Sequence, residues 1–153
     1  PDSRLADWAM QHNPVTTRAL VELMCGGHRI DSALDRLFGL LHCRLHYFDP
    51  VRRRAGLPED VAALVTAMDA DSVRVVLVNV NAVEPRTLIV QGGAYGEHRI
   101  HEVSVSGART TVDSRFVTLR LAPGAGAEIL LRDQRYANQP SMAMPWDGEL
   151  PRH

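Results

Sequence analysis

The pattern of hydrophobic and polar positions divides the chain into a helical part and a β part that meet near residue 71. Apolar residues follow Asn13-Pro14 at helical spacing, and Gly26-Gly27 ends this stretch. Asn is favoured as an N-cap, Pro at the first helical position and Gly just after the last one. A second amphipathic stretch covers 31–41. The pattern therefore predicts two helices before residue 42.

A third helix is predicted over Glu59–Met68. Its apolar residues have the spacing of one buried helix face: Val61, Leu64, Val65 and Met68. Acidic residues in its first turn suit the helix dipole. The short stretch Leu45–Phe48, which precedes it, fits either a strand or the end of a helix.

The densest β signal lies between Val73 and His98. Val73–Val80 is an almost unbroken run of β-branched and aliphatic residues, typical of a strand buried on both faces or nearly so. Asn81–Pro85 interrupts this run with a length suited to a hairpin connection. Thr87–Val90 then resumes the β pattern. We expect an antiparallel hairpin in the middle of a sheet.

Three further β segments follow at short intervals: Arg99–Ser106, Phe116–Leu121 and Glu128–Leu131. About five strands joined by short turns favour a small antiparallel sandwich. The predicted fold class is therefore α+β, with a helical segment over 1–71 and a β-sandwich over 72–153.

The tail after Tyr136 is irregular and carries Met142, Met144 and Trp146. Large apolar side chains are costly to leave in water. We expect this tail to pack against an upstream domain of the same polypeptide or against a homodimer partner. The chain begins with Pro1 rather than Met, which fits a fragment of a longer protein.

Composition narrows the function classes. The 153 residues are 45% hydrophobic with a net charge of −1, which is typical of a globular domain and argues against nucleic acid or an anionic membrane as a partner. No apolar run approaches the roughly 20 residues of a membrane span, so we expect a soluble protein. All 17 basic residues are Arg, a bias that fits a GC-rich bacterial genome.

Two stretches carry a resemblance. LVNVN leads toward the RTLIV strand, and VTLRLAPGAGAEILL contains the turn Leu121-Ala122-Pro123-Gly124. Over roughly 72–132 the chain resembles the C-terminal β-sandwich of multidomain bacterial carbohydrate-active enzymes, in which helices of an α/α-toroid domain precede the sandwich. The resemblance implies that 1–71 is the end of a larger helical domain. It also implies that the sandwich is structural and that the catalytic carboxylates lie upstream. It transfers no catalytic residue to this chain.

Four residues have the spacing of a metal site: Cys25, His28, Cys43 and His46. Zinc prefers four thiolate and imidazole ligands from closely spaced pairs. The alternative is two core cysteines with histidines at helix ends or on the surface.

The glycine-rich stretch Gln91–His98 contains Tyr95, Glu97 and His98. Such a loop can present these side chains to a ligand, and Glu and His are capable of proton transfer. The alternative is a tight β-turn with a polar strand end, which is the more frequent use of loop glycines.

The aromatic residues Trp8, Tyr95, Tyr136 and Trp146 allow sugar stacking, although domain packing explains them equally well. No nucleophile elbow, phosphate-binding loop or dinucleotide fingerprint occurs. Together with the resemblance, this leads us to expect a non-catalytic accessory portion of a larger carbohydrate-active enzyme, without a cofactor. The alternatives are a carbohydrate-binding module and a small metal-dependent enzyme or zinc-stabilised domain.

Overall fold

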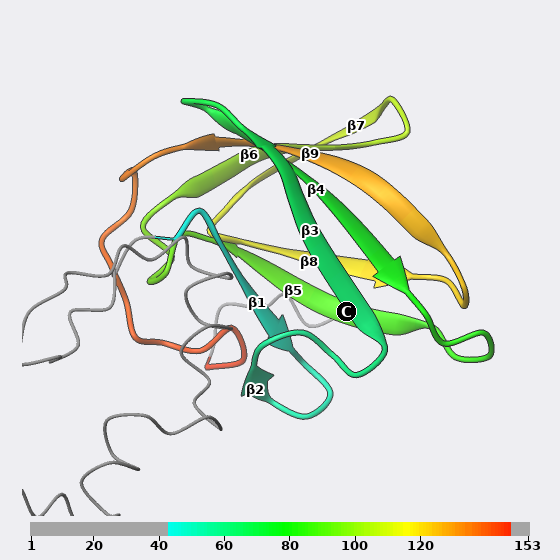
Figure 1. Cartoon of the computed structure of the whole chain (residues 1–153). Coiled ribbons are helices and arrows are strands. Elements are labelled where there is room, and N and C mark those ends of the chain that lie inside the picture. The colour runs from blue at the N-terminus through cyan, green and yellow to red at the C-terminus, as the bar shows by residue number, and fades with distance from the viewer. Residues whose placement is uncertain (1–42, 148–153) are drawn as a thin grey trace, which may run out of the picture. The chain divides into compact units, whose positions relative to one another are not determined.

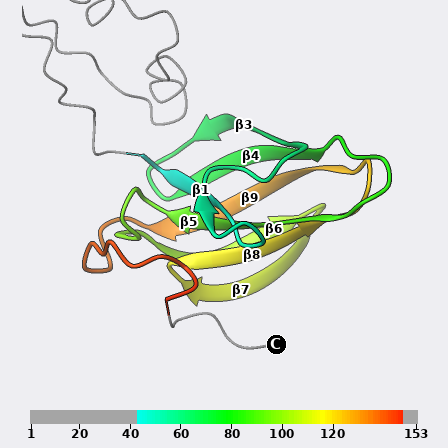
Figure 2. The ribbon, with the colours of Figure 1, turned by 90° about the horizontal axis from the view of Figure 1, so that it is seen from below.

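The computed structural model describes residues 43–147, which form two antiparallel β-sheets and contain no helix. Figures 1 and 2 show the two sheets from two directions at right angles. The first sheet has the order β2-β1-β5-β8, with bounds β1 Leu45–Asp49, β2 Arg54–Ala55, β5 Arg86–Gly92 and β8 Phe116–Leu121. The second has the order β3-β4-β9-β6-β7, with bounds β3 Val61–Met68, β4 Ser72–Asn79, β6 Arg99–Val105, β7 Ala108–Ser114 and β9 Gly126–Gln134.

The two sheets face each other across one hydrophobic core. The first sheet contributes Leu45, Tyr47, Leu88, Val90, Val117 and Leu121. The second contributes Val73, Val75, Leu77, Ile100, Val103, Ile129 and Leu131. Each fully buried aliphatic side chain contributes about 1.5–3 kcal/mol relative to an exposed one. This part of the chain is thus a β-sandwich.

A smaller apolar cluster contains Phe48, Ile89 and Phe116 from three neighbouring strands of the first sheet. Phe48 and Ile89 face each other across β1 and β5, and their chain neighbours Tyr47 and Leu88 point into the main core. Side chains alternate between the faces of a strand, so this cluster lies on the outer face of the first sheet. Trp146 packs against it, which means that the tail returns over this face.

The α+β prediction is wrong for the described residues. The segment predicted as a helix over Glu59–Met68 contains strand β3, which pairs antiparallel with β4 from Val61 to Met68. The helical spacing of its apolar residues does not mark a buried helix face, because Leu64 and Met68 are exposed. The two helices predicted before residue 42 lie outside the described residues. Leu45–Phe48 is a strand, and the sandwich begins with it rather than at residue 72.

The expected hairpin between Val73–Val80 and Thr87–Val90 is also wrong. Both segments are strands, but β4 pairs with β3 and β9, whereas β5 pairs with β1 and β8. The intervening residues 80–85 cross from one sheet to the other. The burial of β4 also alternates, with Val73, Val75 and Leu77 in the core and Arg74 exposed, so only one face of the strand is fully buried.

The later strands match their sequence pattern more closely. β8 has the predicted bounds, Phe116–Leu121, and β6 ends one residue before Ser106. β9 extends beyond the predicted Glu128–Leu131 at both ends. β7 was not expected, because its sequence ARTTVDS has only one large apolar residue. Across residues 43–147, no helix is long and apolar enough to cross a membrane.

Candidate functional site

The glycine-rich loop joins β5 to β6 at one end of the sandwich. Three backbone hydrogen bonds fix its base: Gly93 N–H donates to the Arg44 carbonyl at 2.9 Å, Gly92 N–H to the Arg115 carbonyl at 3.0 Å, and His98 N–H to the Gly92 carbonyl at 3.0 Å. The loop is therefore tied to segments on both of its sides as well as to itself.

Glu97 folds back beneath its own loop. Its two carboxylate oxygens accept the N–H groups of Ala94 at 3.2 Å and Tyr95 at 2.7 Å. Only 5% of Glu97 is exposed. A carboxylate bound to backbone N–H groups makes a strong, charge-assisted contact, so Glu97 holds the turn in place.

Gly93 is the residue that allows this close approach. Its φ is +86°, a conformation that side-chain-bearing residues rarely adopt, and a Cβ here would lie 2.3 Å from the carboxyl carbon of Glu97. Glycine supplies both the left-handed backbone and the space. The carboxylate of Glu97 occupies the place where another residue would have its side chain.

His98 is fully buried, with 0% exposure. Its Nδ1 accepts the backbone N–H of Tyr136 at 3.1 Å, and the Tyr136 ring packs edge-on against the imidazole at 5.0 Å between centroids. Burial lowers the pKa of His98; the charges of Glu97 and Asp133 oppose this effect, and those of Arg44 and Arg135 reinforce it. The neutral ring, with Nδ1 as an acceptor, is the form that fits this site.

The chain after β9 covers the loop through Asn138. The Asn138 side-chain amide donates to the carbonyls of Gly96 at 3.0 Å and His98 at 3.1 Å. Its backbone N–H donates to the Glu97 carbonyl at 3.1 Å. The Nε of Arg99 completes the contact by donating to Asn138 Oδ1 at 3.3 Å. Asn138 thereby satisfies three loop carbonyls at once, a role for which the sequence carries no recognisable signal.

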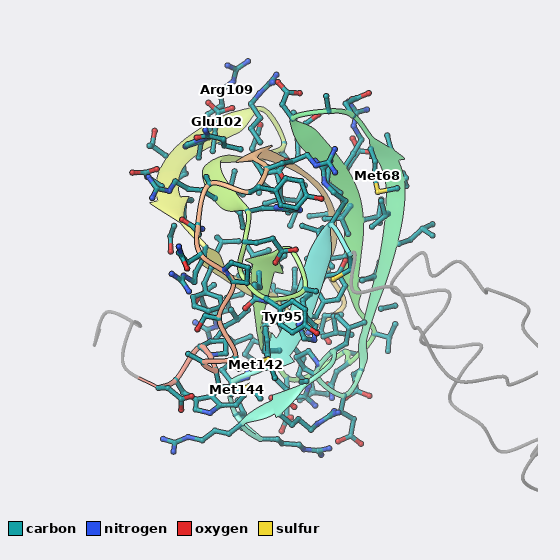
Figure 3. All side chains as sticks on the ribbon, turned by 90° about the vertical axis from the view of Figure 1, so that its left-hand side faces the viewer. Met68, Tyr95, Glu102, Arg109, Met142 and Met144 are labelled. Atoms are coloured by element: carbon teal, nitrogen blue, oxygen red, sulfur yellow. The ribbon has the colours of Figure 1, made fainter. Side chains whose placement is uncertain are left out.

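Of the aromatic candidates, Trp8 lies outside the described residues, and Tyr95 and Trp146 have different surroundings. Ser141 N–H donates to the Tyr95 carbonyl at 2.8 Å, and Figure 3 shows Tyr95 on the same side of the sandwich as Met142 and Met144. Trp146 meets Phe48 edge-on, with ring centroids 6.0 Å apart. Trp146 is thus engaged in covering the first sheet. This arrangement matches the packing alternative better than it matches a flat sugar platform.

Of the metal candidates, Cys43 and His46 lie within the described residues, whereas Cys25 and His28 lie outside them. Cys43 is buried. His46 Nδ1 lies 3.3 Å from the Ala94 carbonyl and its ring packs against Phe48. Burial lowers the pKa of His46, and the Ala94 carbonyl and the charge of Glu97 partly offset this. Residues 43–147 contain no group of three or more His, Cys, Asp or Glu side chains that could hold a metal ion.

A buried ion pair lies beside the loop and was not anticipated from the sequence. Arg44 donates to Asp133 Oδ1 at 2.7 Å, with side-chain exposures of 9% and 3%. Arg44 also donates to the Asp69 carbonyl at 3.0 Å. The charges of both partners also act on the pKa of His98, Asp133 raising it and Arg44 lowering it. Within residues 43–147, Arg44 Nε and Asp133 Oδ2 are buried without a hydrogen-bond partner.

A separate hollow lies on the second sheet, with a volume of about 290 Å³. It is lined by Arg74, Ser104, Ser106, Gly107, Glu128 and Leu130. Arg74 and Glu128 approach each other to 3.7 Å and are about half exposed. The two charges inside this hollow are therefore largely directed at each other.

Comparisons with protein-family models, with curated proteins and with solved structures find no match to this chain. The interpretation of the site consequently depends on its own geometry. In that geometry, the polar groups of the loop are used to hold backbone: Glu97 binds the turn, His98 binds the start of the tail, and Asn138 binds the loop carbonyls.

Proposed function

We propose that residues 43–147 form a non-catalytic structural module of a larger carbohydrate-active enzyme. The observation that carries the non-catalytic part is the position of Glu97. A general acid or base must come within hydrogen-bond reach of its substrate. Both oxygens of Glu97 already accept backbone N–H groups inside the loop, and the residue is almost fully buried.

His98 supports the same proposal. Its Nδ1 is occupied by the N–H of Tyr136, and the residue has no exposed surface. Bringing His98 to a substrate would require breaking that bond and displacing the Tyr136 ring. The adjacent Glu–His pair therefore fits a structural role better than proton transfer.

The carbohydrate-active part of the proposal rests on the sequence resemblance alone, and the two motifs that carry it lie together in the fold. Asn79 donates through its side-chain amide to the Ala122 carbonyl at 3.1 Å and through its backbone to the Ala125 carbonyl at 2.9 Å. Gly124 N–H in turn donates to the Asn81 carbonyl at 2.8 Å. The Asn-rich turn and the Leu-x-Pro-Gly turn thus form one structural unit at the end of the sandwich opposite the glycine-rich loop.

The test is a hydrolysis assay of the full chain on a panel of polysaccharides, alongside Glu97→Gln and the matched control Glu128→Gln, which alters an exposed carboxylate. We expect no hydrolysis from any of the three proteins. Hydrolysis that Glu97→Gln abolishes and Glu128→Gln preserves would overturn the non-catalytic assignment. Sugar-dependent quenching of tryptophan fluorescence would instead favour a carbohydrate-binding module.

The assignment to a larger enzyme has its own test, the intact mass of the native gene product in its source cell. We expect a mass well above the 16.9 kDa of this chain, with glycan-directed activity in the longer product. A native product near 16.9 kDa would contradict the larger-enzyme part while leaving the structural role of the loop unaffected.

A further inference from the structure

Within the described residues, strand β3 is an edge strand that lacks two of the usual protections, charge and proline. It ends the order of its sheet, and its eight residues, VAALVTAM, include no charge and no proline. Proteins normally shield sheet edges with charges, prolines or very short strands. The other three described edges follow that practice, since β2 has two residues, β7 carries Arg109 and Asp113, and β8 carries Arg120. Figure 3 shows Met68 on β3 and Arg109 near β7.

The register of β3 identifies the backbone groups that face outward from the sheet. Val80 N–H donates to the Asp60 carbonyl at 2.8 Å, immediately before β3 begins. Hydrogen-bonded and non-hydrogen-bonded pairs alternate in an antiparallel ladder. The backbone N–H and carbonyl groups of Ala62 and Leu64 therefore form hydrogen bonds with β4. Those of Ala63 and Val65 point away from β4. These outward groups form a template for one more strand.

The side chains near this edge are apolar and exposed. Leu64 is 65% exposed and Met68 is 62% exposed. Leu64 lies opposite Val76 and Ala62 opposite Val78 on β4, and these positions alternate with the core residues of β4. The apolar area therefore continues from the edge onto the outer face of the second sheet. Exposed apolar areas that adjoin unpaired strand edges are typical of interaction surfaces.

We propose that β3 pairs antiparallel with β3 of a second copy of this chain, with the two-fold axis at Ala63. This register places Ala63 opposite its symmetry mate, Val61 opposite Val65, and Ala62 opposite Leu64. On the outer face, each large Leu64 side chain then covers the small Ala62 of the other copy. The two five-stranded sheets join into one continuous sheet.

A second copy fits this surface better than a charged or unrelated peptide does. Strand β3 carries no charge that would attract a charged peptide. Its small Ala62 and large Leu64 complement each other when two copies pair about a two-fold axis at Ala63. A register shift between Val65 and Ala67 interrupts the regular strand and limits the pairing to about the first five residues. A two-fold contact of this kind closes on itself and yields a dimer rather than a fibre.

The first test is sedimentation equilibrium of the full chain, comparing the wild type with Leu64→Lys and Val83→Lys. Both substitutions place a charge at an exposed apolar residue, but Val83, which is 82% exposed, lies outside β3. We expect the wild type and Val83→Lys to be dimers and Leu64→Lys to be a monomer at the same concentration. A monomeric wild type, or a dimer that Leu64→Lys does not affect, would overturn the proposal.

The second test fixes the register by cross-linking. Opposed residues of a non-hydrogen-bonded pair have Cα atoms about 4.5 Å apart, within the range that a disulfide spans. Mild oxidation should therefore cross-link Ala62→Cys to Leu64→Cys when the two variants are mixed, whereas neither variant alone should exceed the background of the wild-type cysteines. Cross-linking of one variant with itself, or no gain on mixing, would contradict pairing about Ala63.

Discussion

The imidazole of His98 and the backbone of Tyr136 are joined by a hydrogen bond of 3.1 Å, in which Nδ1 accepts the Tyr136 N–H. The Tyr136 ring closes over the same imidazole at 5.0 Å. This contact fixes the residue before β6 to the start of the tail after β9. It requires Nδ1 to be unprotonated, so the structure and the charge state of His98 depend on each other.

Stability should fall as the pH decreases below about 6.5, the ordinary pKa of histidine. Burial lowers the pKa of His98 in the folded protein, so the unfolded chain binds a proton first and the free energy of unfolding rises with pH in this range. Urea unfolding at several pH values measures this slope. His98→Asn retains an acceptor for the Tyr136 N–H but does not titrate. It should show a shallower slope that is still positive, because the pKa of His46 is also lowered. An unchanged slope would contradict this account.

Gly93→Ala should cost much more stability than Gly107→Ala. The two glycines have nearly the same φ, +86° and +85°, so the backbone strain is matched. A Cβ at Gly93 meets the carboxyl group of Glu97, whereas a Cβ at Gly107 meets nothing within 4 Å. We expect a loss of about 1 kcal/mol at Gly107 from strain and about 3 kcal/mol at Gly93, where overpacking is added. Equal losses in denaturant unfolding would show that Glu97 does not fill this space.

Removing one partner of the Arg44–Asp133 pair should lower the free energy of unfolding more than removing both partners does. Asp133→Asn leaves the Arg44 charge buried without its partner, which costs about 3–5 kcal/mol. The double variant Arg44→Met/Asp133→Leu removes both charges, and we expect it to be more stable than Asp133→Asn. The exposed pair of Arg74 and Glu128 provides a control, because Glu128→Gln should cost no more than about 1 kcal/mol. A double variant less stable than Asp133→Asn would contradict this interpretation.

Asn79 should be the most important side chain at the opposite end of the sandwich. It is fully buried, donates to the carbonyls of Glu84 and Ala122, and accepts the N–H of Asn81. Asn79→Ala leaves these groups unsatisfied, and we expect a loss of about 2–3 kcal/mol. Asn81→Ala should cost less, because Asn81 is partly exposed and water can replace its contacts. If Asn81→Ala lowered the thermal unfolding temperature more than Asn79→Ala does, the central role of Asn79 in joining the two turns would be contradicted.

The sequence predicts the sandwich better than its connections. Strand β8 alternates in period two and was predicted with its observed bounds, because its own side chains carry the signal. Strand β3 was taken for a helix, since Val61, Leu64, Val65 and Met68 also match a helical period. Val61 packs against the core, but Leu64, Val65 and Met68 are exposed, so a buried helix face does not produce this pattern. Local periodicity cannot report which strands pair, so the passage of 80–85 between sheets was missed as well.

The site shows the same limit. The glycines of the loop and its acidic and histidine residues are visible in the sequence. Asn138, which lies about 40 residues further along, gives no local sign that it will bind the carbonyls of Gly96 and His98. The pairing of Arg44 with Asp133 spans a separation of 89 residues. Such contacts depend on topology, which short-range patterns do not specify.

The most direct test of the structural role of the loop is an NMR titration of the imidazole nitrogens in the full chain. We predict that His98 titrates below its ordinary pKa of 6.5, with Nδ1 as the unprotonated acceptor and the proton on Nε2 in the neutral ring. Added oligosaccharides should leave its signals unchanged. A His98 that titrates at or above its ordinary pKa, with signals that shift when a glycan is added, would contradict the assignment of this loop as a structural element.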